Sequence, residues 1–153
     1  MKIRPEDLFA DLQDWNEGKG ATFQEWLGCY GGIEYAVAFS TLFWPEFQVF
    51  HDCVFIASFC DEESFQTWLR CSKGDLAGVE AMVNHQHISD LFMNGSPEGT
   101  AEQLNYLGEV LKETWQAKLN LEFPDRRMVV DFYPAKADDL VAAQITFYTK
   151  RNV

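Results

Sequence analysis

Three side chains that could act as acid, base or nucleophile stand out in this sequence: Cys29, Glu34 and His87. Glu34 is the only charge in a predicted helix, residues 33–44, that is apolar nearly all round, and we expect such a helix to be buried. A carboxylate is costly to bury without partners, and buried carboxyl groups often serve in acid–base chemistry. The alternative is that the helix keeps one narrow wet edge, which Glu34 would share with Ser40 or Thr41.

Cys29 lies among glycines, in the segment Gly28–Gly32, where a helix is expected to break. A backbone that allows close approach there could form part of a pocket, although cysteine is also a common small core residue. The cluster is not a phosphate-binding loop, because it lacks the required glycine spacing and its Lys. Cys53 and Cys60 stand in apolar surroundings, which favour inert thiols. No Gly-x-Ser-x-Gly pattern is present.

The two histidines His85 and His87 are two residues apart in a stretch that we predict to be helical, from Asp75 to about Phe92. On a regular helix such residues point roughly 200° apart, so they cannot hold one ion together. Zinc-binding helices place their histidines four residues apart instead. We therefore expect no metal site and no cofactor, and we expect His87 to pack against the protein.

The charges are distributed unevenly. Between Gly20 and Leu111, thirteen acidic and only two basic residues contribute −11 of the net charge of −12. Nucleic-acid binding depends on neutralising phosphates, so this surface argues against it. An acidic surface attracts basic proteins, although the excess of acids could simply keep an aromatic-rich chain in solution.

Aromatic residues are dense between Phe23 and Trp68. Most must belong to the core, but tryptophan and tyrosine are also enriched at binding hot spots. An aromatic patch beside acids would suit a basic partner. The candidate binding residues are Trp26, Tyr30, Trp44, Trp68, Asp61, Glu62 and Glu63.

The local patterns predict a single α+β domain over residues 1–153. Thr22-Phe-Gln-Glu25 and Thr100-Ala-Glu-Gln103 are capping boxes that should each begin a helix. Two antiparallel hairpins are expected at about residues 46–59 and 126–149, because β-branched and aromatic residues dominate the first and apolar residues alternate in the second. We expect both hairpins in one sheet covered by five or six helices, and a loop at residues 94–97.

No export signal or membrane-spanning stretch is evident, and the four cysteines form no CxxC pair, so a cytoplasmic location with reduced thiols is expected. The best hypothesis for function is a small acidic protein-binding module, of the inhibitor or immunity-protein kind, that engages a basic protein and is not an enzyme. One alternative is a small enzyme or small-molecule-binding protein with a pocket near Cys29, Glu34 and His87. Another is a homo-oligomeric interaction protein, for instance a homodimer, that has no catalytic site.

Overall fold

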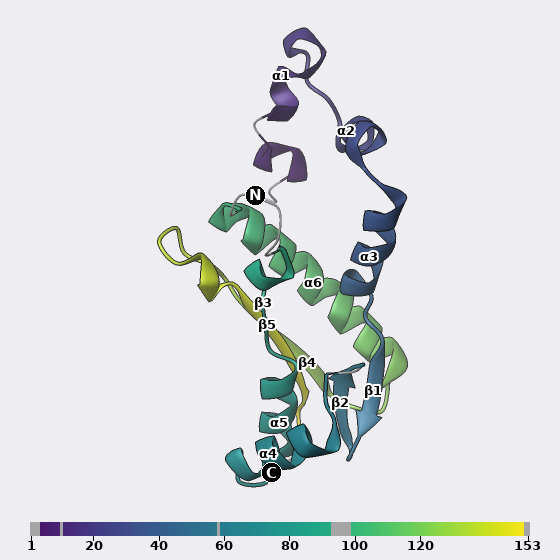
Figure 1. Ribbon diagram of the computed structural model, residues 1–153, viewed down its shortest axis with the longest axis vertical. Helices are drawn as coiled ribbons and strands as arrows, with labels where there is room; N and C mark the ends of the chain where they lie inside the picture. Colours follow the sequence, from purple (N-terminus) through teal and green to yellow (C-terminus); the bar gives the residue numbers. More distant parts are fainter. Residues whose placement is uncertain (1–3, 10, 58, 93–98, 152–153) are drawn as a thin grey trace. The chain divides into compact units, whose positions relative to one another are not determined.

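The computed structural model describes residues 4–9, 11–57, 59–92 and 99–151 (Figure 1). The predicted loop at residues 94–97 lies outside these ranges. Internal contacts divide the chain into two compact units, Met1–Leu42 and Phe43–Val153. That the two units form one domain stays a prediction. In the described residues, no helix is long and apolar enough to cross a membrane.

The first unit is helical in its described part. A 3-10 helix, η1 (Pro5–Leu8), is followed by α1 (Asp11–Gly18), which is interrupted where Asn16 and Glu17 adopt left-handed backbone angles. The capping box predicted at Thr22 is confirmed: its hydroxyl accepts from the N–H of Glu25, whose carboxylate accepts from the N–H of Thr22. It begins α2 (Phe23–Tyr30), which ends at Gly31 as expected, and α3 (Ile33–Phe43) follows.

The second unit alternates strands and helices, which together with the first unit confirms the predicted α+β class. The elements of the second unit are β1 (Phe47–Phe50), β2 (Cys53–Ile56), α4 (Glu62–Cys71), α5 (Leu76–Val83), β3 (Gln86–His87), η2 (Ser89–Phe92), α6 (Ala101–Glu122), β4 (Met128–Tyr133), η3 (Leu140–Ala142) and β5 (Gln144–Thr149). The second capping box, Thr100 with Gln103, is also confirmed and begins the long helix α6.

Both predicted hairpins are present, but the expectation that they share one sheet is wrong. β1 and β2 form a two-stranded antiparallel sheet, whereas β4, β5 and β3 form a second sheet with β5 in the middle. Pairing stops because side chains of α5 take the backbone groups at the facing edges. Glu80 accepts from the N–H groups of Val54 in β2 and Thr149 in β5, and Asn84 donates to the carbonyls of Val54 and Phe147.

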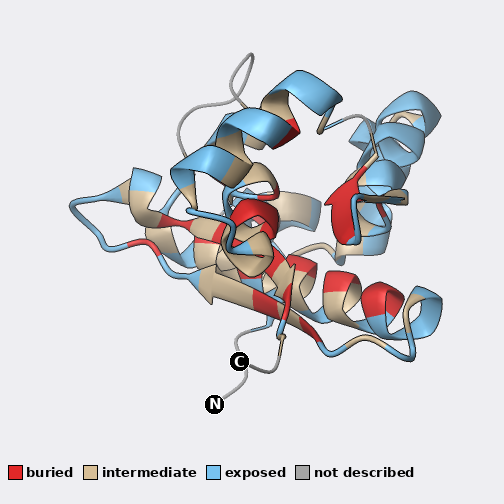
Figure 2. Ribbon diagram, turned by 90° about the horizontal axis from the view of Figure 1, so that it is seen from below, coloured by how far each residue is buried: buried red, intermediate tan, exposed pale blue. Residues whose placement is uncertain are grey.

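The buried residues of the second unit lie mainly on its strands and on one side of α6 (Figure 2). One cluster joins β2 to α4 and α5 through Cys53, Phe55, Phe65 and Val79. Along the other sheet, the Trp115 ring of α6 meets Phe147 of β5 edge to face at 5.9 Å. The other edge of the three-stranded sheet is also covered, since Gln116 bonds to the backbone of β4 at Met128 and Val130.

Candidate functional site

The helix predicted over residues 33–44 is present as α3 (Ile33–Phe43), but the expectation that it is buried is wrong. None of the residues of α3 is buried. Several large apolar side chains of α2 and α3 are instead exposed to solvent, and we call five of them the apolar helix surface. They are Leu27, Tyr30, Ile33, Tyr35 and Val37, with exposed fractions of 54, 67, 84, 69 and 61%.

The position of this surface follows from local packing in the first unit. Neighbouring side chains of α2 contact the N-terminal segment, where the Phe9 ring lies 4.9 Å from that of Phe23 and 6.0 Å from that of Trp26. Tyr30 is steadied by ring contacts at 5.6 Å with both Trp15 and Trp26. These ring contacts cover Phe23 and Trp26 in part, but they leave Leu27 and most of Tyr30 exposed.

Two acidic residues, Glu25 and Glu34, accompany the apolar helix surface on α2 and α3. Glu25 is exposed and begins the first turn of α2. The backbone N–H and the hydroxyl of Thr22 both donate to its carboxylate, which holds its pKa below the ordinary value. Glu34 is likewise exposed, at the start of α3. From residue 20 to 69 the sequence contains no Lys or Arg, so no cation in that stretch offsets the two carboxylates.

The three candidate catalytic residues fall on different elements. Cys29 is exposed on α2, and Glu34 is exposed on α3. His87 lies in β3 of the second unit, where its Nδ1 is 2.8 Å from the carbonyl oxygen of Val141. A catalytic role for these residues stays a prediction.

The candidate binding residues also differ in their surroundings. Tyr30 belongs to the apolar helix surface, while Trp26 is half-buried beside it. Trp44 is partly exposed, and the Nζ of Lys118 lies 5.6 Å from its ring centre, within the range of a cation–π contact. Trp68 packs against the core cluster of the second unit, so its ring serves packing.

The acidic run at residues 61–63 lies at the start of α4. Asp61 is the N-cap: its carboxylate accepts from the N–H of Ser64, which lowers its pKa. Glu62 has a lowered pKa because His51 lies 2.8 Å from its carboxylate and Gln66 donates to it. Glu63 is exposed in the first turn of the helix. Asp61 and Glu62 therefore already have hydrogen-bond partners within the protein.

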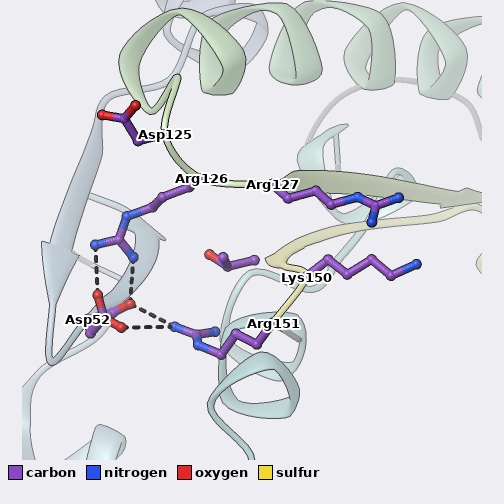
Figure 3. Close-up of a pocket in the computed structure, with 7 residues that line it drawn as sticks. Asp52, Asp125, Arg126, Arg127, Lys150 and Arg151 are labelled. Carbon is purple, nitrogen blue, oxygen red and sulfur yellow. Dashed lines mark hydrogen bonds and ion pairs between the residues drawn. The ribbon is translucent and has the colours of Figure 1, made fainter. Parts of the chain in front are cut away.

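A pocket of about 570 Å³ opens at the end of the β4–β5 hairpin (Figure 3). Asp52, in the turn between β1 and β2, accepts from Arg126 at 2.9 Å and lies 3.8 Å from Arg151. Both guanidinium groups also donate to its backbone carbonyl at 2.7 Å. Arg127 and Lys150 extend away from Asp52. The residues that line the pocket are Asp52, Asp125, Arg126, Arg127, Thr149, Lys150 and Arg151.

The chemistry of this pocket is that of a salt-bridged junction. Two of its guanidinium groups are bonded to Asp52, and Arg151 also donates to Glu80 at 2.7 Å. The described residues that line it include no histidine or cysteine that could act as base or nucleophile. None of Cys29, Glu34 and His87 lines it. The junction connects the β1–β2 turn to the end of the second sheet.

Glu80 and Asn84 are the important residues that sequence reasoning missed. Glu80 is fully buried, and Asn84 is fully buried one turn later. A signal for Glu80 was present, because it is the only charge in the apolar stretch Leu76–Val83, just as Glu34 is in its own helix. No local pattern distinguishes a lone carboxylate that will be bridged by backbone N–H groups from one that will face water.

The fold and these surfaces define an acidic α+β protein with an exposed apolar, acid-flanked pair of helices. Comparison with known proteins adds no relative to this description: no family model, curated protein or solved structure matches the chain.

Proposed function

We propose that this chain is a protein-binding module that recognises a basic protein through the apolar helix surface of α2 and α3. The observation that carries the proposal is the exposure of five large apolar side chains within residues 27–37. Leu27 and Tyr30 share one side of α2, Ile33 and Val37 share one side of α3, and exposed apolar groups gathered beside polar ones are typical of interaction sites. Tyrosine, present twice in this surface, supplies much contact area while its hydroxyl stays solvated.

The charges near the surface determine the chemistry of the partner. Glu25 and Glu34 are exposed, and the nearest basic residue C-terminal to them in the sequence is Arg70. A partner with apolar contact residues flanked by Lys or Arg would match both features, because complementary charge steers association and suppresses wrong partners. Blocking a cationic protein, as an inhibitor or immunity protein does, is the role that fits such a surface.

A second copy of this chain fits less well as the partner. In a two-fold symmetric dimer the same patch meets itself, which would bring Glu25 and Glu34 close to the same acids of the other copy. Like charges placed against each other across an interface cost free energy. An anionic membrane would repel these carboxylates for the same reason.

A cytoplasmic location is part of the proposal. All four cysteines lie in the described part of the chain and none forms a disulfide there. Exposed free thiols such as Cys29 and Cys71 persist in a reducing compartment. A partner should therefore be sought among proteins that enter or reside in the cytoplasm.

The test is capture of a partner by the tagged full chain at low and at high salt, with matched variants. Ile33→Ser with Val37→Ser removes the most exposed aliphatic side chains of the surface. Leu121→Ser, which changes an equally exposed leucine on α6, is the control. We expect a basic protein bound by the wild type and the control, released at high salt because screening weakens charge pairing, and not bound by the double variant.

Three outcomes would contradict the proposal. One is a captured protein that binds the double variant as tightly as the wild type. Another is a concentration-dependent dimer in sedimentation experiments that the double variant abolishes, which would identify a second copy as the occupant. The third is a large fall in the melting temperature of the double variant, which would show that the rest of the chain covers this surface.

A further inference from the structure

The stretch that contains His85 and His87 is not helical, contrary to the sequence-based expectation. Helix α5 ends at Val83, and the chain continues directly into β3. The end is decided by Asn84, which caps the helix while its buried side chain accepts from the N–H of Ile56 and donates to the carbonyls of Val54 and Phe147. In an extended chain, residues two apart point to the same side. The helical geometry that argued against binding of one metal ion by both histidines therefore does not apply.

The structure brings the two imidazole rings together. Their centres are 4.9 Å apart and their planes are nearly perpendicular. Two imidazoles bound to one zinc ion at about 2.0–2.1 Å have ring centres roughly 5 Å apart. His85 is exposed and His87 is half-buried, so an ion can reach the pair from solvent.

Hydrogen bonds determine which ring nitrogens are protonated. The carbonyl oxygen of Val141 can only accept, so in the neutral ring of His87 the Nδ1, 2.8 Å away, carries the proton and Nε2 has the lone pair. Gln144 donates from Nε2 to the same carbonyl at 3.5 Å, which turns its Oε1 toward His85. The Nε2 of His85, 2.9 Å from that oxygen, is the donor, and Nδ1 keeps its lone pair.

This arrangement matches the surroundings of metal-binding histidines, which typically donate their other ring N–H to a carbonyl or carboxylate oxygen. We propose that His85 and His87 together chelate one divalent transition-metal ion of the kind that prefers imidazole nitrogen: Cu²⁺, Ni²⁺ or Zn²⁺. Within the described residues no third His, Cys or carboxylate joins them, so water completes the coordination. Ca²⁺ and Mg²⁺, which require oxygen ligands, are not bound there.

The test is calorimetric titration of the tag-free full chain with CuCl₂ and with ZnCl₂, with MgCl₂ as the control salt. Cys29→Ser and Cys71→Ser remove the two exposed thiols, which would otherwise compete for the metal. We expect one ion per chain, bound more tightly for Cu²⁺ than for Zn²⁺. His85→Ala or His87→Asn should each weaken binding at least tenfold. Asn at position 87 can still donate to Val141, which protects the fold.

His51→Ala is the matched control, because His51 lies against Glu62 and has no second histidine beside it in the described part of the chain. Equal affinity in the parent and in either pair variant would overturn the proposal, as would an equal loss in His51→Ala. In proton spectra, substoichiometric Cu²⁺ should broaden the ring signals of His85 and His87 before those of His51. Simultaneous broadening of all three would mean adventitious binding only.

Discussion

Helices α3 and α5 make an instructive pair, because each is apolar and each carries a single charge, a glutamate. Glu34 in α3 is exposed, together with the apolar residues around it. Glu80 in α5 is fully buried and accepts hydrogen bonds from Val54, Thr149 and Arg151. Similar composition therefore leads to opposite environments. The difference lies in partners: α5 lies between two strand edges whose N–H groups need an acceptor, and a guanidinium group completes the carboxylate's set.

The largest difference expected between α3 and α5 is in how much their glutamates contribute to the free energy of unfolding. Glu80→Ala should lower the free energy of unfolding by about 3–5 kcal/mol, because it leaves two buried N–H groups and the Nη1 of Arg151 without their acceptor. Glu34→Ala should change it by less than about 0.5 kcal/mol, as exposed substitutions do. Urea denaturation followed by circular dichroism measures both. Equal effects of the two substitutions would remove the distinction drawn between α3 and α5.

The next largest difference is expected in cysteine reactivity, between Cys29 in the first unit and Cys53 in the second unit. Burial, reinforced by the nearby Glu80 carboxylate, raises the pKa of Cys53 from 9.0 to about 11. At pH 8 this alone makes its thiolate roughly 100-fold scarcer, so iodoacetamide should modify Cys29 and spare Cys53 in the native protein. Peptide mass spectrometry reads the two sites. Modification of Cys53 as fast as Cys29 would show that β2 is open to solvent.

The same shift links stability to pH. The folded protein keeps the Cys53 proton to a higher pH than the unfolded chain. The contribution of the protonated thiol to the free energy of unfolding is therefore complete below about pH 9. It is lost as the pH rises through about 11. Cys53→Ala should flatten that part of the stability profile, which urea denaturation at several pH values measures.

Two helical glycines, one in α6 of the second unit and one in α2 of the first unit, give the third comparison. A methyl group at Gly108 of α6 would overlap the ring of Phe132, whereas one at Gly28 of α2 would meet nothing within 4 Å. Gly108→Ala should destabilise the protein by about 1–3 kcal/mol through overpacking. Gly28→Ala should stabilise α2 by about 0.5–1 kcal/mol through helix propensity. Thermal melts of both variants test the pair, and stabilisation by Gly108→Ala would mean that α6 and β4 are not in close contact.

The two capping boxes give the smallest effect. Thr22→Ala and Thr100→Ala should each cost about 1 kcal/mol of helix stability. We expect the loss at Thr100 to appear in global unfolding, because α6 carries much of the core. The loss at Thr22 should appear only as faster amide exchange in α2, which contains no buried residue. A global loss of stability from Thr22→Ala would instead show that α2 belongs to the cooperative core.

The sequence by itself determined the elements that depend on neighbouring residues. Thr22 and Thr100 begin helices, Gly31 ends one, and the alternation along residues 128–149 forms a hairpin, because capping and side-chain periodicity act over a few residues. Only the tertiary structure decided where α5 ends, why the hairpins stay in separate sheets, and which glutamate is buried. These outcomes depend on Glu80 and Asn84 meeting backbone groups dozens of residues away, and a local pattern carries no record of such distant hydrogen-bond partners.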